Sequence, residues 1–206
     1  MWSRGVSGGR RVTDVADLRQ ELRRARRKLT TAERATASER VAAELATLLG
    51  AQRPGRLATY LASDGELDPN VAAPQLRAAG WELHLPVLVG RWSMTFVAWT
   101  EHAELVENRY GIPEPRTDVE HAARTAAEMD VVLLPAVALD GAGNRMGMGA
   151  GFYDRTLEGI RTEHRTPLLV GIAHDAALVD ALEPAPWDVP VDVVLTDRRV
   201  LRPDRA

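Results

Sequence analysis

The feature that most limits how this chain can fold is a continuous apolar run, Asp130-Val-Val-Leu-Leu134. An apolar run without alternating polar residues is typical of a strand that is buried on both faces, as in parallel sheets. Other segments that resemble buried strands are 56–61, 81–88, 94–99, 168–173 and 191–196. Helical segments separate several of them. This alternation predicts a layered α/β fold around a largely parallel sheet.

Two helices are predicted before the first strand. Over 13–29, apolar residues recur every three or four positions, and Thr13 or Asp14 is the expected N-cap. Thr30 or Thr31 begins a second helix that runs to Leu49 and stops at Gly50. A turn is expected over 63–65, and further helices over 69–79, 119–127 and 152–161.

The length of the chain suits one globular domain, since 206 residues with 45% hydrophobic composition can bury a substantial core. No proline-rich linker divides the sequence, so we expect a Gly/Ser/Arg-rich flexible tail over 1–11 and a single domain over 12–206. We find no signal-peptide pattern and no apolar run of the roughly 18 residues that span a bilayer. A cytoplasmic protein without a membrane segment is therefore expected.

Charge and cysteine content narrow the function classes. The chain has no cysteine, which excludes disulfides, thiolate metal sites and a cysteine nucleophile. The net charge of −3 is uneven, because residues 10–28 hold eight basic and three acidic side chains. Such a helix can meet nucleic acid, a phosphate-bearing ligand or only solvent.

A glycine loop is the clearest candidate for chemistry. Gly147, Gly149 and Gly151 precede a predicted helix, and glycine lets backbone N–H groups approach an anion without a Cβ in the way. Successive N–H groups and a helix N-terminus favour phosphate, and Arg145 could add a forked donor. A flexible structural turn is the alternative interpretation.

Two better-known glycine motifs do not fit this loop. A dinucleotide fingerprint needs another glycine where Phe152 stands and a tight turn directly after the strand. A P-loop needs Gly-Lys-Ser/Thr, whereas the only lysine of the chain is Lys28. A phosphate site at this loop would therefore be of a different kind from these two motifs.

Acidic side chains near the predicted strand ends offer further candidates. Asp154 could hold Mg²⁺, which needs only one or two protein carboxylates, or could compensate the dipole of the predicted helix. Asp188 and Asp192 could supply a second carboxylate or act as turn residues. Glu66 follows a strand, where ligands bind in open α/β sheets, and a carboxylate can accept two N–H donors of a heterocycle. Among five histidines only His174 merits attention, since none has metal-ligand spacing.

Together these features resemble one family. The segment Pro135-Ala-Val-Ala-Leu-Asp-Gly-Ala-Gly-Asn-Arg-Met-Gly-Met-Gly-Ala-Gly-Phe-Tyr-Asp-Arg155 is similar to the signature of 5-formyltetrahydrofolate cyclo-ligases, also called methenyltetrahydrofolate synthetases. That signature runs approximately Pro-Gly-x-x-Phe-Asp, a short gap, then Gly-x-Arg-Leu-Gly-x-Gly-x-Gly-Tyr-Tyr-Asp. Other segments agree with the family in order and spacing: Leu18-Arg19, Lys28 to Arg34, Tyr60 to Glu66, Tyr110 to Pro115, and Asp188 to Asp197.

The resemblance implies both a fold and a set of site residues. The fold would be a three-layer α/β/α arrangement similar to the NagB/RpiA/CoA-transferase-like fold. Asp154 and Asp188 would hold Mg²⁺, and Arg145, Tyr153 and Asp154 would be catalytic. The folate would contact Leu61, Glu66 and Tyr110, with the Glu66 carboxylate on the pterin edge. ATP would contact Arg19, Arg145, Met146, Gly147, Met148, Gly149, Ala150, Gly151, Phe152 and Tyr153.

Three departures from the family pattern stand out. Val15 occupies the position of a usual lysine four residues before Arg19, and Arg10 or Arg11 could compensate for its loss. Phe152 replaces a tyrosine and removes one hydroxyl. Leu139 replaces the phenylalanine of Phe-Asp, which is a conservative packing change. The lysine loss alone bears on a phosphate contact.

The reaction implied by the resemblance is an ATP-dependent cyclisation of 5-formyltetrahydrofolate to 5,10-methenyltetrahydrofolate, with release of ADP and phosphate. It needs positioning and charge stabilisation but no covalent nucleophile. The implied partner is a small-molecule substrate, with no nucleic acid or membrane, and a monomer is expected. Two alternatives stay open from the residues: a sugar-phosphate isomerase or CoA-transferase-like enzyme on the same fold, and a nucleic-acid-binding module that uses the basic first helix.

Overall fold

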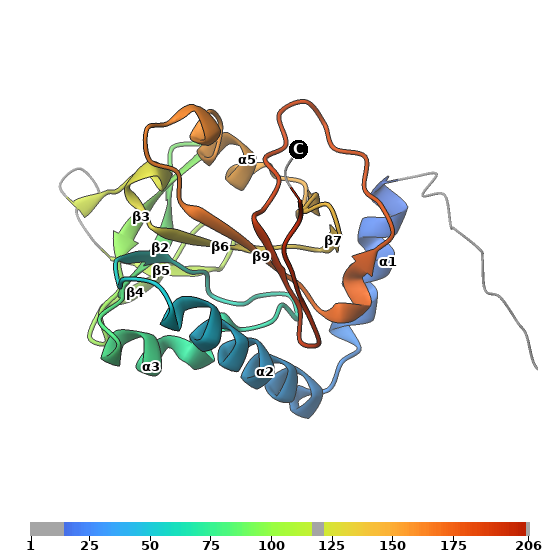
Figure 1. The fold of residues 1–206 in the computed structure, drawn as a ribbon, viewed down its shortest axis with the longest axis horizontal. Coiled ribbons are helices and arrows are strands. Elements are labelled where there is room, and N and C mark those ends of the chain that lie inside the picture. Colours follow the sequence, from blue (N-terminus) through green and yellow to red (C-terminus); the bar gives the residue numbers. More distant parts are fainter. Residues whose placement is uncertain (1–14, 117–121, 205–206) are drawn as a thin grey trace, which may run out of the picture.

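A seven-stranded sheet forms the centre of the molecule (Figure 1). The computed structural model describes residues 15–116 and 122–204. Across the sheet the strands are β12 (Val200–Leu201), β11 (Val193–Leu195), β9 (Leu168–Ile172), β6 (Val131–Pro135), β1 (Arg56–Ala58), β2 (Glu82–Val89) and β3 (Ser93–Ala98). Strands β11, β9, β6, β1 and β2 are parallel, and the edge strands β12 and β3 are antiparallel to their neighbours. The predicted largely parallel sheet is confirmed.

The apolar run that predicted a doubly covered strand is β6, between β1 and β9. Val131, Val132, Leu133 and Leu134 are each at most 1% exposed. Because side chains of a strand alternate between faces, this run supplies both apolar cores: Val131 and Leu133 join one, while Val132 and Leu134 join the other.

One face of the sheet is covered by α2 (Thr31–Gly50) and α3 (Ala73–Ala78), as Figure 1 shows. Thr30 begins α2 with a capping box, in which its side chain accepts the Glu33 backbone N–H and the Glu33 carboxylate accepts the Thr30 N–H. Val41, Leu45 and Leu49 of α2 are almost fully buried in the core on this face. The spacing of four residues places all three on one side of the helix.

The opposite face is covered by α5 (Phe152–Thr156) and the 3₁₀ turns η2 (Ala126–Glu128) and η3 (Ile160–Thr162). Met129, Leu157 and Ile160 pack there in the second core. Helical segments on both faces complete the predicted three layers. No helix in the described ranges is long and apolar enough to cross a membrane.

Two predicted helices are wrong in extent. Of the helix predicted over 119–127, residues 119–121 lie outside the described ranges, and Arg124 exchanges backbone hydrogen bonds with Phe96, which holds it extended. The helix predicted over 152–161 ends at Thr156. Gly159 then adopts a left-handed backbone with φ 71°, which a continuing right-handed helix excludes.

Several shorter elements also differ from the predictions. Strand β1 ends at Ala58 rather than at position 61, and the helix predicted over 69–79 begins as the 3₁₀ turn η1 (Pro69–Ala72) before α3. Two small sheets were not predicted, because their strands have only two or three residues: β4 (Leu105–Glu107) with β5 (Pro113–Pro115), and β7 (Ala138–Asp140) with β8 (Arg145–Met146) and β10 (Leu178–Val179).

The N-terminal helix α1 (Val15–Arg27) lies apart from the layers, beside the loops at one edge of the sheet (Figure 1). The tail predicted over 1–11 and the N-cap expected at Thr13 or Asp14 fall outside the described residues.

Candidate active site

Loops that follow the carboxyl ends of the parallel strands meet at one edge of the sheet. The Asp64 loop (63–66) follows β1, and the glycine loop (145–154) follows β6 through the β7–β8 hairpin. His174, which follows β9, has its Nε2 3.0 Å from the Gly65 carbonyl oxygen. This edge is where ligands bind in open α/β sheets.

The glycine loop starts on the β7–β8 hairpin. Arg145 pairs with Leu139 and Met146 with Ala138, so the first residues of the loop are part of a sheet. Gly149 and Gly151 have φ of 97° and 67°, in the region that favours glycine. The loop therefore needs glycine at these two positions for its backbone conformation.

Arg19 connects α1 to this loop. Its Nε donates to the Gly147 carbonyl oxygen at 2.9 Å, across 128 residues of sequence. A Cβ placed on Gly149 would lie 3.8 Å from the Arg19 guanidinium carbon. The structure thus brings together the helix arginine and the loop that the sequence assigned jointly to ATP.

Arg145 and Asp154 close the two ends of the glycine loop on each other. The Nη2 of Arg145 donates to the Asp154 carboxylate at 2.5 Å, and the Arg145 side chain is only 5% exposed. Its Nε is buried and has no hydrogen-bond partner among the residues that the structure describes. A buried cation with a spare donor suits an anionic ligand, because leaving the donor unpaired costs free energy.

Tyr153 lies beside the charges of both loops. Burial, followed by the negative charge of Glu66, raises the pKa of Tyr153 well above its ordinary range, while the positive charge of Arg145 opposes this shift. The hydroxyl group therefore stays protonated and can donate a hydrogen bond. The neighbouring Phe152 packs edge to face on Tyr110, with ring centroids 5.9 Å apart. Tyr110 is 53% exposed.

Asp64 is the centre of a charge cluster that we did not predict from the sequence. Its backbone adopts φ of 51°, unusual outside glycine. The Arg23 Nε and Arg26 Nη2 donate to its Oδ2 at 2.9 and 2.8 Å, and Arg27 bonds its Oδ1. Burial opposes ionisation, but hydrogen bonds from Arg27, Arg23 and Arg26 hold the pKa of Asp64 well below its usual range.

Glu66 is partly engaged by its own loop. Its Oε2 accepts the Ser63 backbone N–H at 3.0 Å, and its Oε1 lies 3.6 Å from the Arg26 Nη2. Burial raises the pKa of Glu66, while the bond from Ser63 and the charge of Arg26 partly offset this. Its predicted contact with a pterin remains a prediction.

The two carboxylates assigned to Mg²⁺ lie in separate local arrangements. Asp154 pairs with Arg145, and Asp188 accepts the Ala185 backbone N–H at 2.8 Å. Over 15–116 and 122–204, no group of three or more metal-ligating side chains is found. Mg²⁺ can be held by one or two carboxylates together with waters and substrate phosphates, so the donor chemistry fits. Asp192 instead supports β9, accepting the Leu169 N–H at 2.7 Å.

The remaining predicted ligand residues differ in exposure. Met148 is 44% exposed and Ala150 is exposed, so both are accessible on the loop. Met146 is 6% exposed, and its side chain faces the protein interior. Leu61 is half-buried in the segment that follows β1. Val15, at the usual lysine position, is 51% exposed, and Arg10 and Arg11 lie outside the described residues.

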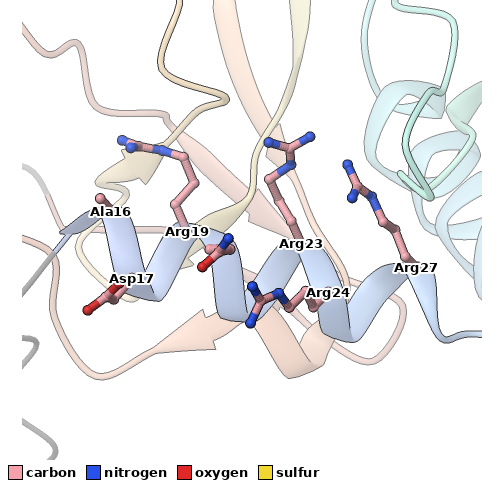
Figure 2. Close-up of a pocket in the computed structure, with 7 residues that line it drawn as sticks. Ala16, Asp17, Arg19, Arg23, Arg24 and Arg27 are labelled. Atoms are coloured by element: carbon pink, nitrogen blue, oxygen red, sulfur yellow. The ribbon is translucent and has the colours of Figure 1, made fainter.

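The basic face of α1 also borders a hollow of about 400 Å³ that is lined by α1 side chains (Figure 2). Figure 2 shows Arg19, Arg23 and Arg27 extending from one side of the helix. Arg23 and Arg27 hold Asp64, whereas Arg19 bonds the glycine loop. We therefore place the candidate site at the loops rather than along the helix.

The sequence did contain one signal for the Asp64 cluster. Arg26 stands four residues after Leu22 and three before Leu29, within the apolar stripe of the helix. A charged residue in such a stripe predicts a buried ion pair, because buried charges are almost always paired.

Comparison with known proteins identifies relatives over nearly the whole chain. Residues 12–197 match the model of the 5-formyltetrahydrofolate cyclo-ligase family. The 5-formyltetrahydrofolate cyclo-ligase of Escherichia coli (strain K12) is 36% identical over 181 residues, covering 87% of this chain and 98% of the relative. That of Haemophilus influenzae is 31% identical, covering 86% and 95%.

Solved structures agree with these relatives. The chain resembles Aquifex aeolicus 5,10-methenyltetrahydrofolate synthetase with a TM-score of 0.78 and 30% identity, covering 93% of this chain and 94% of the other. A Mycoplasma pneumoniae 5,10-methenyltetrahydrofolate synthetase gives a TM-score of 0.72 at 21% identity, covering 90% and 99%. The second likeness supports the fold.

Proposed function

Since the chain belongs to the 5-formyltetrahydrofolate cyclo-ligase family, we propose that ATP and Mg²⁺ drive its reaction at the glycine loop. The protein is a ligase of folate metabolism that converts 5-formyltetrahydrofolate to 5,10-methenyltetrahydrofolate. The relatives and the family model do not support the isomerase, transferase and nucleic-acid alternatives. What we propose beyond this is the division of the site between two loops.

The observation that carries the proposal is the set of donors around the glycine loop. Arg19 reaches the Gly147 carbonyl, and Arg145 keeps a buried Nε without a partner in the described chain. Gly149 and Gly151 have positive φ, a conformation found in backbone turns whose successive N–H groups bind anions. Arginine forks and backbone N–H groups are the usual ligands of a triphosphate, so the residues fit ATP.

Asp154 and Asp188 are the residues proposed to hold Mg²⁺. A bound magnesium ion would neutralise phosphate charge and orient the phosphates. The Asp154 carboxylate already pairs with Arg145, so a metal there would share this carboxylate with the arginine. We propose that Glu66 accepts N–H groups of the pterin, with Leu61 and Tyr110 contacting the rest of the folate.

The reaction then follows from the chemistry of the formyl group. An amide oxygen is a poor leaving group, so the N5-formyl oxygen is first phosphorylated. N10 attacks the formyl carbon and gives up its proton, the carbon–oxygen bond breaks, and phosphate leaves with that proton as the ring closes. Arg19, Arg145 and the loop N–H groups stabilise the charge that develops on the phosphoryl oxygens. Tyr153 stays protonated beside Glu66 and can donate to the substrate.

The experiment is an absorbance assay. Purified protein with MgATP and 5-formyltetrahydrofolate is expected to form the near-ultraviolet band of the methenyl product, and removal of Mg²⁺ by a chelator is expected to abolish it. Product formation without nucleotide would contradict the ATP proposal while leaving the family assignment intact. The single domain over 12–206, the monomeric state and the cytoplasmic location remain predictions.

A further inference from the structure

Arg26 occupies a position that the family-derived site does not assign. We propose that it is a further catalytic residue, whose Nη1 donates a hydrogen bond to the phosphoryl group as that group passes to the formyl oxygen. This inference rests on the proposed function, because it requires a phosphoryl transfer at the meeting point of the two loops.

The Arg26 side chain is buried, but one of its hydrogen-bond donors has no acceptor in the described residues. Arg26 is 6% exposed, and its Nη1 is buried with no hydrogen-bond partner in the described part of the chain. Buried polar groups almost always have a partner, and an unpaired guanidinium nitrogen is costly. An acceptor that arrives with the substrates would explain why this donor is buried and unpaired in the free protein.

The Arg26 guanidinium group is also held in a fixed orientation. The Arg26 Nε donates to the Asp64 carbonyl oxygen at 2.8 Å, and its Nη2 donates to the Asp64 carboxylate at 2.8 Å. Two bonds to one residue fix the plane of the guanidinium group, as in other forked arginine contacts. The Nη1 is therefore held in place before any ligand binds, which is the condition for electrostatic stabilisation of a transition state.

Arg26 lies between the Asp64 loop and the glycine loop. The Arg26 Nη2 lies 3.6 Å from the Glu66 carboxylate, the proposed pterin ligand. It also lies 3.4 Å from the Met148 Sδ, on the proposed ATP loop. The folate and the nucleotide must touch where these loops meet. Met148 is 44% exposed and has a flexible side chain, so an arriving phosphate can displace it.

The chemistry requires such a donor. The formyl oxygen forms a bond to the terminal phosphorus, the bond from that phosphorus to the bridging oxygen breaks, and its electron pair leaves with ADP. Negative charge is spread over the transferred oxygens in this transition state. A fixed guanidinium donor at the junction stabilises that charge without reorganising.

Arg26 could have the purely structural role of holding Asp64. The chain offers a matched control for that alternative in a second arginine that bonds the same carboxylate. Arg27 is adjacent on α1 and bonds the same carboxylate, but its side chain is 52% exposed. If Arg26 only supports Asp64, then Arg26→Met and Arg27→Met should affect turnover similarly. If Arg26 contacts the phosphoryl group, only Arg26→Met should lower kcat strongly.

We expect Arg26→Met to lower kcat about 100-fold, the usual effect of losing one such donor, with Arg27→Met within about threefold of wild type. Calorimetric binding of inorganic phosphate to the protein with MgADP should weaken in Arg26→Met and not in Arg27→Met. Guanidinium ion should restore part of the turnover of Arg26→Ala. Equal kcat values for Arg26→Met and Arg27→Met would overturn the inference.

Thermal melting of each variant shows whether it is folded at the assay temperature. If Arg26→Met melts below the assay temperature, Arg26→Lys decides the question, because lysine keeps a charge beside Asp64 but cannot present a second fixed nitrogen. A fall in kcat of about tenfold or more supports the proposal, and unchanged kcat contradicts it. An inactive wild-type protein would instead contradict the proposed function, so the two failures are distinguishable.

Discussion

The glycine loop and the Asp64 loop lie at the same edge of the sheet but differ in how their charged groups are paired. In the glycine loop the cations keep unused donors: Arg145 has a buried Nε without a partner in the described residues. In the Asp64 loop the anion is saturated, since three arginines of α1 bond one carboxylate. The glycine loop thus keeps an unpaired donor, while the Asp64 carboxylate is neutralised within the protein. Among the arginines bonded to that carboxylate, Arg26 keeps one nitrogen, Nη1, without a partner in the described residues.

Because of this difference, we expect substitutions in the glycine loop to affect mainly turnover and substitutions of Asp64 to affect mainly stability. A donor without an acceptor gains its partner only when substrate binds, so its removal should reduce catalysis more than stability. A carboxylate already paired in the free protein contributes to folding whether substrate is present or not. Substitutions in the two loops therefore test whether the unpaired donor serves turnover and the paired carboxylate serves stability.

The largest effect on turnover is expected from Arg145→Met. Loss of the spare donor at the phosphate site should lower kcat/KM by about 100- to 1000-fold. The measurement is steady-state formation of the methenyl product, and Lys28→Met, at an exposed position on the same molecule, should behave as wild type. A loss below tenfold would place the phosphates elsewhere and remove the contrast between the loops.

The second effect concerns the backbone of the glycine loop. Gly149→Ala forces a side chain into φ of 97°, which costs about 1–3 kcal/mol or shifts the loop. We expect KM for ATP to rise by about 10-fold or more, because a shifted backbone would move the N–H groups that we propose as phosphate ligands. The matched control is Gly80→Ala, where φ is 93° but the position follows α3.

Gly80→Ala should lower the melting temperature through similar backbone strain and leave KM for ATP unchanged. If both variants lose stability but neither changes KM, the glycine loop is only a structural turn.

The third effect tests the one acid of the Asp64 loop that we assign to substrate. Glu66→Gln removes a charged acceptor, which should raise KM for the folate by about 10- to 100-fold. Burial raises the pKa of Glu66, so the carboxylate form is lost as pH falls through that raised pKa. KM of the wild type should therefore increase at a higher pH than an ordinary glutamate would produce.

In Glu66→Gln this acid rise in KM should disappear, since no proton can be taken up at that position. A rise that persists in the variant would assign the titration to another group.

The sequence predicted the sheet and the glycine loop but not the Asp64 cluster, for a physical reason. A buried strand such as β6 and a glycine loop are local patterns, visible within about ten residues. Arg26 and Asp64 are 38 positions apart, and no local pattern reports a pairing at that distance. The helix predicted over 152–161 was too long because Gly159, a single residue, interrupts it.

The short hairpins were missed for a related reason. Strands β7 and β8 have three and two residues, too few for a period of two to be recognised. They nevertheless position Arg145, so the part of the fold that supports the glycine loop was the part least visible in the sequence.

The smallest effect on turnover is expected from Asp64→Asn, which should instead lower stability. Breaking the contacts to the three arginines leaves the buried Arg26 with a weaker acceptor, at a cost of about 2 kcal/mol at neutral pH. For a chain of this length that corresponds to a fall in melting temperature of about 4–8 °C. Turnover at 25 °C and neutral pH should fall less than tenfold, because Arg26 keeps its bond to the backbone carbonyl of position 64 and the amide oxygen of the variant can still accept from its Nη2.

The pH dependence of this variant separates the two loops most clearly. The pKa of Asp64 is lowered in the folded protein from its ordinary value of 3.8, so its contribution to stability is complete above that value. It is lost as pH falls through the lower folded-state pKa, when the carboxylate takes up a proton. The difference in free energy of unfolding between wild type and Asp64→Asn should therefore be constant near neutrality and shrink below about pH 4. Denaturant unfolding at several pH values measures it, and a difference that persists unchanged below pH 3 would mean that ionised Asp64 does not carry the stability of this loop.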